Sequence, residues 1–584
     1  MKRFIYYTAV FLLFVLSAQS SIFSLQSIEL SRSPIVGIIQ DNQVPIKVKG
    51  TSTGNVRIEY FEGNDSVSNF SQWEYLSYSD DLTKSLMLND INYNTEYTYR
   101  AIFADGSSSE WFSFSTFPQQ SQSGEFSFVF STCFRVNFLP HNIFNYISTL
   151  SPTFVALLGD QIYADYDGNI NTGPPNSVVP ALRSKYAQNF DEHFQAMSST
   201  VPIIATWDDH DYGQDNSDST YIYKVETKKV FKENFPIYPY QVEDEGIYYQ
   251  FKIADVDVFV LDTRWYRSPM DVVDDEDKTM LGEEQLSWLL NGLNQSTAPF
   301  KLILSSVSMN DYGGDTSSGR EGYDSWMGYT FERNTILSFI EDNQIYGVLV
   351  FSGDQHYPSG YILNWNTPLN SVSQTDSSIV YSLSDLGLVV FDFSSSPLHY
   401  NRATGHALIP GNQNNPFYSF EIFRAELGHP SVYGLVEVDT ENFTKSVAVT
   451  FYELDSENES MIRLYGITVI RDSLTAVISQ SIEIPSYFLI KQNYPNPFNG
   501  ETNIIYSLPE GNFVELIIYD ILGSEVITLV KDFHAAGEYN VTWNGNNSYG
   551  TPMPSGIYFY RITVFSDQLL DQSFHAMKRM IYLK

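Results

Sequence analysis

Six short apolar runs between residues 126 and 351 constrain the fold of this 584-residue chain more than any other feature. Each has the length and composition of a buried strand, and together they cover Phe126–Thr132, Thr153–Leu158, Val201–Thr206, Val256–Leu261, Lys301–Ser305 and Tyr346–Phe351. Helical spacing lies between some of them, as in residues 283–293, where leucines recur at positions i, i+3, i+4 and i+7. Strands that alternate with helices predict an α/β domain built in layers.

Polar residues that can bind a metal or a phosphate follow five of these runs. They are Cys133 and Arg135, Asp160 and Tyr163, Asp209 and His210, Arg264, and Asp354 and His356. In open α/β sheets, ligands bind at the carboxyl ends of the strands, so we expect residues far apart in sequence to converge at one place. Each motif alone also fits an ordinary turn or a capped loop, but their number and order within one domain favour a binding site.

The residue types at these strand ends suit two metal ions held close together. Carboxylates are hard ligands and one of them can bridge two cations, imidazole suits transition metals, and thiolate and phenolate suit softer or strongly Lewis-acidic ions. Asp160 stands where a bridging carboxylate is expected, with Tyr163 shortly after it. Two ions about 3.5–4 Å apart would clamp a phosphate and ionise a water between them.

Residues 124–480 resemble the PhoD-like metallophosphatases, a branch of the calcineurin-like phosphoesterase superfamily. The motifs that carry the resemblance are Ser-Thr-Cys at 131–133, Gly-Asp-x-x-Tyr at 159–163, Trp-Asp-Asp-His-Asp at 207–211, Asp-Thr-Arg at 262–264, Gly-Asp-x-His at 353–356 and Ser-Ser-Ser-Pro-Leu at 394–398. The resemblance implies a layered α/β metallophosphoesterase domain that hydrolyses phosphate esters, with a β-sandwich before it.

The same resemblance implies a set of metal ligands. A ferric ion would be held by Cys133, Asp160, Tyr163 and His356. A second, divalent ion would be held by Asp160, Asp209 and Asp354. The expected pair is Fe³⁺ with Ca²⁺, and Zn²⁺ or Mn²⁺ are the alternatives.

His210 matches the invariant histidine of the family's metal loop, which implies that it contacts the phosphate or protonates the leaving oxygen; with Asp209 it forms the expected catalytic pair. Arg135 and Arg264 are candidates for guanidinium forks on the phosphate oxygens, and structural ion pairs are the alternative for both. The order Asp215-Asn216 departs from the family's usual Asn-Asp, which leaves open which of the two meets the metal.

Two β-rich segments flank this domain. Residues 24–118 alternate between polar and apolar positions, resemble a fibronectin III-like β-sandwich and carry no expected chemistry. Residues 487–584 resemble the type A C-terminal sorting domain of type IX secretion substrates. That match starts at Asn-Tyr-Pro-Asn-Pro-Phe-Asn (493–499) and ends near the basic pair 578–579. It implies the type IX secretion machinery as a partner.

Residues 1–20 have the features of a signal peptide: Lys2 and Arg3, an apolar stretch, and Ala-Gln-Ser at 18–20. No later run reaches the ~20 apolar residues that span a bilayer. The mature chain is therefore expected to have no transmembrane segment and to be secreted or held at the cell surface. The chain has one cysteine, which excludes an intramolecular disulfide.

The charge balance limits the partners of the chain. Lys and Arg number 33 against 69 Asp and Glu, a formal net charge of −36, so nucleic-acid binding is not expected. An anionic substrate needs a local positive centre, which bound metals supply. Together with the family resemblance, these features predict a secreted phosphoric ester hydrolase of the alkaline phosphatase type that attacks with a metal-bridging hydroxide. The alternatives are a phosphodiesterase or phospholipase D-like hydrolase of lipid or polymer headgroups, and a non-catalytic cell-surface protein.

Overall fold

The computed structural model describes residues 27–63, 67–135, 139, 141–165, 175–310, 324–364, 378–382, 389–398, 418–424, 431–442, 444–455, 460–471, 489–508, 512–534, 537–565 and 573–584. The chain forms two compact units, Met1–Ser473 and Leu474–Lys584. The predicted signal peptide lies outside the described residues. Within them, no helix is both long and apolar enough to cross a membrane.

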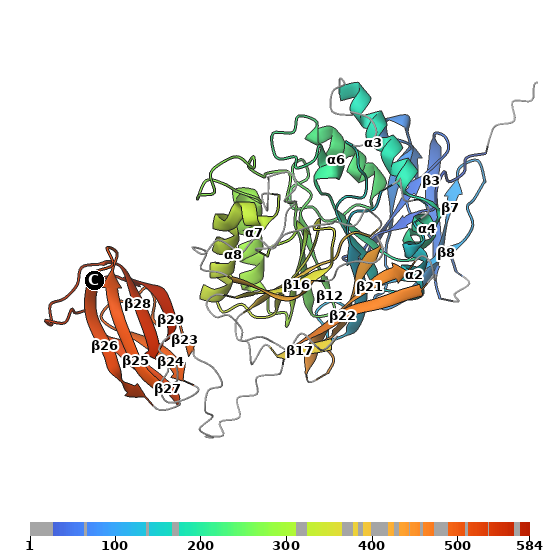
Figure 1. Cartoon of the computed structure of the whole chain (residues 1–584). Coiled ribbons are helices and arrows are strands. Elements are labelled where there is room, and N and C mark those ends of the chain that lie inside the picture. Colours follow the sequence, from blue (N-terminus) through green and yellow to red (C-terminus); the bar gives the residue numbers. More distant parts are fainter. Residues whose placement is uncertain are drawn as a thin grey trace, which may run out of the picture. The chain divides into compact units, whose positions relative to one another are not determined.

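The first unit begins with two small antiparallel sheets (Figure 1). One sheet contains β1 (Ile35–Val36), β2 (Val44–Lys49) and β6 (Thr83–Leu88). The other contains β3 (Gly54–Glu62), β4 (Asn69–Phe70), β5 (Glu74–Leu76), β7 (Glu96–Phe103) and β8 (Phe112–Ser115), and a short 3-10 helix, η1 (Tyr78–Asp80), precedes β6. Side chains on β3 and β7 alternate between buried and partly exposed, as expected for a half-buried sheet. The N-terminal segment is therefore antiparallel β, as predicted.

Two mixed sheets of seven strands form the centre of the first unit. The first sheet has the order β11-β10-β9-β20-β21-β22-β17 and consists of β9 (Glu125–Ser131), β10 (Phe154–Leu158), β11 (Ile203–Thr206), β17 (Ser378–Ser382), β20 (Val432–Asp439), β21 (Lys445–Asp455) and β22 (Ser460–Arg471). The second has the order β12-β13-β14-β15-β18-β16-β19 and consists of β12 (Tyr249–Ile253), β13 (Val256–Val260), β14 (Lys301–Val307), β15 (Val348–Gly353), β16 (Ser359–Asn364), β18 (Val390–Ser394) and β19 (Tyr418–Arg424).

The two large sheets pack face to face through aromatic side chains. The Phe351 ring of β15 lies edge-on to Phe128 and Phe130 of β9, with centroid distances of 5.3 and 5.0 Å. These contacts join the inner faces of the two sheets into one core. Buried aromatic pairs of this kind contribute about 0.5–1.5 kcal/mol each beyond their area.

Helices surround these sheets (Figure 1). Those of the described residues are α2 (Ile143–Thr149), α3 (Pro175–Asn189), α4 (Glu192–Ser198), α5 (Asp209–Tyr212), α6 (Lys224–Asn234), α7 (Gly282–Gln295), η5 (Trp326–Tyr329) and α8 (Thr330–Asp342). Leu289 of α7 and Ile336 of α8 belong to the apolar cluster that covers the outer side of β13, β14 and β15. The predicted helical periodicity at 283–293 is confirmed by α7.

All six predicted apolar runs form strands. Beyond them, β20 pairs antiparallel with β9, with Leu435 opposite Val129, so β20, β21 and β22 extend the first large sheet. The physical reason is that β9 would otherwise present an unpaired edge of backbone groups.

The second unit is a small antiparallel β structure. One sheet contains β23 (Leu489–Ile490), β24 (Thr502–Leu508) and β27 (Gly537–Trp543). The other contains β25 (Asn512–Asp520), β26 (Glu525–His534), β28 (Gly556–Phe565) and β29 (Ser573–Tyr582). Trp543, Leu516 and Tyr560 are buried in its own apolar core.

Candidate metal centre

The predicted site residues follow strands whose carboxyl ends meet. β9, β10 and β11 run parallel, as do β13, β14 and β15, so the loops after each set emerge at one edge of its sheet. Left-handed backbone occurs at four predicted ligands: Cys133 (φ 62°), Asp160 (φ 57°), Asp354 (φ 64°) and His356 (φ 57°). This conformation costs a non-glycine residue about 1–3 kcal/mol and concentrates at functional sites.

Two glycines allow these loops to approach one another. A Cβ on Gly159 would lie 2.4 Å from Cβ of Asp208, and φ of Gly159 is 114°, which other residues rarely adopt. A Cβ on Gly353 would lie 1.9 Å from a methyl carbon of Thr132. Glycine at both positions therefore brings Asp160 close to the β11 loop and Asp354 close to Cys133.

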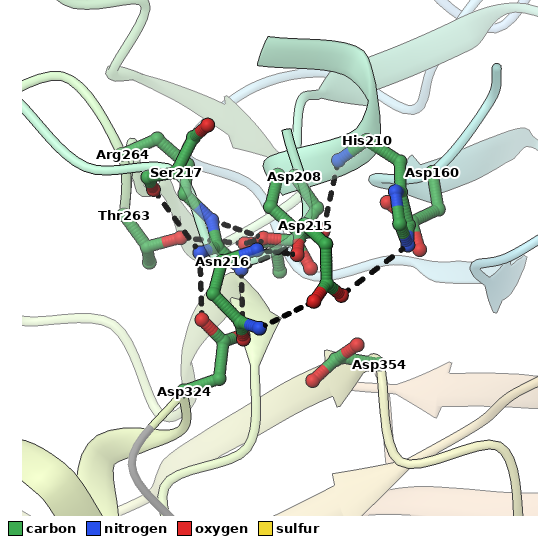
Figure 2. A network of polar contacts seen from close by, with 12 residues as sticks. Asp160, Asp208, His210, Asp215, Asn216, Ser217, Thr263, Arg264, Asp324 and Asp354 are labelled. Atoms are coloured by element: carbon green, nitrogen blue, oxygen red, sulfur yellow. Dashed lines mark hydrogen bonds and ion pairs between the residues drawn. The ribbon is translucent and has the colours of Figure 1, made fainter. Parts of the chain in front are cut away.

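Three overlapping groups of possible metal ligands lie at this place. In each group the ligand atoms are within 4.8 Å of one another, and the groups are Cys133, Asp160 and His356; Asp160, Asp209 and His210; and Asp160, Asp208 and Asp354. Asp160 is common to all three, as expected of a bridging carboxylate. Figure 2 shows the β10 and β11 loops bringing Asp160 and Asp208 together, with Asp354 reaching in from the second large sheet.

The protonation energetics of these groups fit a bound cation. Burial, reinforced by Asp160 and Asp354, raises the pKa of the Cys133 thiol well above its usual value. Burial also raises the pKa of Asp160 and Asp354, and Asp209 and Asp208 add to both shifts. Oδ1 of Asp160 is buried and accepts no hydrogen bond from the described residues. A cation would stabilise the charged forms of all three groups, so the donor set fits a metal centre.

Tyr163 lies beside the same cluster. Its ring is buried and packs on that of His210, with a centroid distance of 4.4 Å. The Arg135 guanidinium carbon lies 5.6 Å from the centroid of the Tyr163 ring. The structure thus places Tyr163 and Arg135 near the possible ligands, and their contacts with metal and substrate stay predictions.

His210 is held by a carboxylate that sequence reasoning missed. Its Nδ1 lies 2.7 Å from Oδ1 of Asp165, and its Nε2 lies 3.9 Å from Asp215. Burial alone lowers the pKa of His210, but the Asp209, Asp160 and Asp165 carboxylates outweigh burial and raise it well above the usual value. The surrounding carboxylates therefore favour the protonated form of His210.

Arg264 forms buried ion pairs with the carboxylates around it, and its contact with a substrate stays a prediction. Its guanidinium is fully buried, donates two parallel hydrogen bonds of 2.8 Å to Asp324, and donates from Nε to Asp208 at 2.7 Å. Arg267 lies 3.0 Å from the same Asp324 carboxylate. Burial alone raises the pKa of Asp324, but the two arginines bring it well below the usual value. Asp324 lies in a part of the sequence without a periodic apolar pattern, so no sequence signal pointed to it.

Asp215 and Asn216 donate hydrogen bonds to the carboxylates on either side of His210. The backbone N–H of Asn216 donates to Oδ2 of Asp209 at 2.6 Å, and its side chain donates to Asp215 at 2.8 Å (Figure 2). The N–H of Asp215 donates to Asp165 at 3.0 Å. These two residues therefore orient Asp209 and Asp165, and which of them meets a metal stays open.

Asp392 is a second buried carboxylate that the sequence did not reveal. It accepts hydrogen bonds of 2.9 Å from the N–H groups of Met309 and Asn310, and one of 2.8 Å from Ser352 Oγ. Burial raises its pKa, which these hydrogen bonds partly offset. Asp392 thus ties together the ends of β14, β15 and β18 just before Asp354. Within its apolar strand it could be recognised only as one polar residue in a buried run.

Comparisons with known proteins agree with this geometry. The family profile described as PhoD-like phosphatase matches residues 128–426. Alkaline phosphatase D from Bacillus subtilis (strain 168) is 24% identical over 267 residues, which cover 40% of this chain and 46% of that enzyme. The chain therefore spans less than half the length of this relative.

Two solved structures share the fold. The structure of PhoD gives a TM-score of 0.55 at 17% identity and covers 76% of this chain and 94% of that chain. Purple acid phosphatase PPD1 from yellow lupin (Lupinus luteus) seeds gives a TM-score of 0.51 at 12% identity and covers 76% and 75%. The predicted layered α/β fold with flanking β units is confirmed.

The C-terminal unit matches a broader class than the one its motifs predicted. Residues 498–568 match the profile described as FlgD Ig-like domain. This match agrees with the two antiparallel sheets of that unit. It assigns the unit to an Ig-like class and does not identify it specifically as a sorting domain.

Proposed function

Because the chain belongs to the PhoD-like phosphatase family, we propose that it is a metal-dependent hydrolase of phosphate esters. One observation carries the proposal: Asp160 is shared by three groups of possible ligands and keeps one buried carboxylate oxygen without a hydrogen bond from the described residues. A carboxylate so placed can bridge two cations.

We further propose which residues hold each metal. Cys133, Asp160, Tyr163 and His356 would hold a ferric ion, because thiolate and phenolate suit a strongly Lewis-acidic metal. Asp160, Asp209 and Asp354 would hold a divalent ion, with Ca²⁺ favoured by the all-carboxylate set and Zn²⁺ or Mn²⁺ as alternatives. When bound, the two metals would polarise the phosphate ester and lower the pKa of a shared water.

The chain's own residues would supply proton transfer and orientation. His210 is fixed through Nδ1 by Asp165, which directs Nε2 toward the side of Asp215. From there it would protonate the leaving oxygen, a contribution of about 10²- to 10⁴-fold. Asp209 is oriented by the N–H groups of His210 and Asn216, at 2.9 and 2.6 Å. Arg135 would contact the phosphate oxygens.

We also propose that the enzyme is exported and reaches the cell surface or medium through type IX secretion. The features that support this are the signal-peptide pattern of residues 1–20 and the ordered motifs of residues 487–584. The test is to delete residues 487–584 in a type IX-competent host and follow the enzyme. Retention of the truncated chain in the periplasm is expected, and unchanged export would refute the proposal.

The test of the catalytic proposal compares metal content and turnover. The full chain is reconstituted with iron and calcium, and a phosphate monoester and a diester are offered at alkaline pH. Hydrolysis that chelation abolishes and metal restores is the expected result, and the preferred ester separates a phosphatase from a phosphodiesterase. A metal-replete chain that hydrolyses neither ester would support the non-catalytic alternative instead.

A further inference from the structure

The outer face of the N-terminal five-stranded sheet carries aromatic side chains that its core does not need. On β3, Val56, Ile58 and Tyr60 point inward and are buried, so the residues between them point outward. Four rings from the segments around this strand remain open to solvent: Phe70 (42% exposed), Trp73 (44%), Tyr75 (54%) and Trp111 (43%). Burying these large rings would be favourable, so a shared exposed face indicates a binding surface.

Strand pairing shows that these rings share one face. Phe70 lies opposite Glu59, and Glu59 lies opposite Arg100 on β7. The Arg100 guanidinium carbon is 4.3 Å from the centroid of the Trp111 ring. From β4 to β8 the face crosses three strand spacings, roughly 14 Å at ~4.8 Å per spacing. The rings thus line an extended row across the sheet.

Two guanidinium groups lie between the rings. Arg100 is paired with Glu59 at 2.7 Å. The guanidinium carbon of Arg57 lies 4.0 Å from the Phe70 centroid and 4.6 Å from the Trp73 centroid. Among the described residues, no carboxylate pairs with Arg57, and its Nε is buried without a hydrogen-bond acceptor. The Glu59 carboxylate that is paired with Arg100 also interacts with the charge of Arg57, so two guanidinium groups share one carboxylate on this face.

This alternation of rings and charged groups differs from the apolar centre of a protein interface, where charged residues are depleted. It suits a sugar polymer, because a pyranose ring offers an apolar C–H face to an aromatic ring and a rim of polar groups to its neighbours. Because Arg57 and Arg100 share the single carboxylate of Glu59, the face favours a sugar that carries a carboxylate.

We propose that this face binds an anionic polysaccharide. The rings of Phe70, Trp73 and Trp111 stack on successive sugars, and Arg57 pairs with a uronate carboxylate. This binding would hold the enzyme on an acidic glycan through a face that contains none of the possible metal ligands. The inference does not rest on the proposed catalytic function.

The test measures the retardation of the full chain in native gels that contain polygalacturonate or, separately, a neutral β-glucan. We expect retardation by polygalacturonate, with an affinity at least tenfold lower for Trp73→Ala/Trp111→Ala and clearly lower for Arg57→Met. The control is Tyr78→Ala, which removes an exposed ring (70%) from the η1 turn of the same segment. Circular dichroism and hydrolysis of a small phosphate ester report whether each variant is folded.

Several outcomes would overturn the proposal. They are no retardation by polygalacturonate, retardation by the neutral glucan alone, equal retardation of the wild-type chain and the Trp73→Ala/Trp111→Ala variant, an unchanged affinity of Arg57→Met, or an equal loss in Tyr78→Ala. Because esterase activity is measured on the same samples, failure of glycan binding is distinguishable from failure of catalysis.

Discussion

Nδ1 of His210 and Oδ1 of Asp165 lie 2.7 Å apart, and both side chains are largely shielded from solvent. Asp165 also accepts the N–H of Asp215 at 3.0 Å, so one carboxylate fixes both the imidazole and the loop that follows it. A carboxylate oxygen accepts, so Nδ1 of His210 is the donor in this contact, and Nε2 is the ring nitrogen left for the proposed proton transfer. Asp165 is thus a positioning residue for His210.

Replacing Asp165 by Asn should lower kcat by roughly 10- to 100-fold, the usual cost of losing the carboxylate partner of a functional histidine. KM and metal content should change little, because Asp165 belongs to none of the ligand groups found. His210→Ala should lower kcat by about 10²- to 10⁴-fold with metal retained. If Asp165 acts through His210, the double variant should be no slower than His210→Ala. Additive losses in the double variant would contradict this relationship.

Removing a predicted iron ligand should release metal. Cys133→Ser and His356→Ala each take one donor from the group formed with Asp160, so iron per chain and turnover should fall together in both variants. Elemental analysis after dialysis measures the first quantity and initial rates the second. The matched control is His193→Ala, whose ring instead lies 3.1 Å from Asn145. A His356→Ala chain with full iron and normal rates would refute the assignment.

Asp324 should be among the most destabilising carboxylates to remove. Asp324→Ala leaves the buried guanidinium groups of Arg264 and Arg267 without their shared partner, and breaking a buried pair costs about 3–5 kcal/mol. The control is Asp255→Ala, which breaks the partly exposed pair with Lys445 and should cost at most about 1 kcal/mol. Thermal unfolding at fixed metal concentration compares the two. Equal melting temperatures would show that the Asp324 clamp contributes little.

The sequence predicted the strands that carry the site better than it predicted the partners within the site. Apolar runs that end abruptly in Asp160 or Asp354 mark buried strands, because burial on both faces permits no alternation. The pairing of β20 with β9 joins residues some 300 positions apart, and no local pattern encodes it. The sequence shows that residue 264 is an arginine but not which anion it binds. A phosphate ester and the Asp324 carboxylate both offer anionic oxygens to a guanidinium group.

The stability of the α7–α8 region should depend on pH through Glu332. Burial raises the pKa of Glu332 to about 7, although hydrogen bonds from Thr279 and from the N–H groups of Leu281 and Met280 oppose the shift. Unfolded glutamate titrates near pH ~4.3. The folded state therefore holds an extra proton between these two values. The resulting stabilisation is complete below the unfolded pKa and is lost as pH rises through about 7.

Glu332→Gln removes this titration, so the melting temperature of the variant relative to wild type should rise between pH ~5 and ~8. The corresponding change in unfolding free energy is at most about 3 kcal/mol, from ~1.4 kcal/mol per pKa unit. The control is Glu437→Gln, which makes the same substitution on the exposed side of β20 instead of at a buried position. Any loss of hydrogen bonds in Glu332→Gln lowers the melting temperature by the same amount at every pH. The test is therefore the change with pH in the difference between variant and wild type. A flat difference for Glu332→Gln would show that the carboxyl is already ionised in the folded protein at pH ~5.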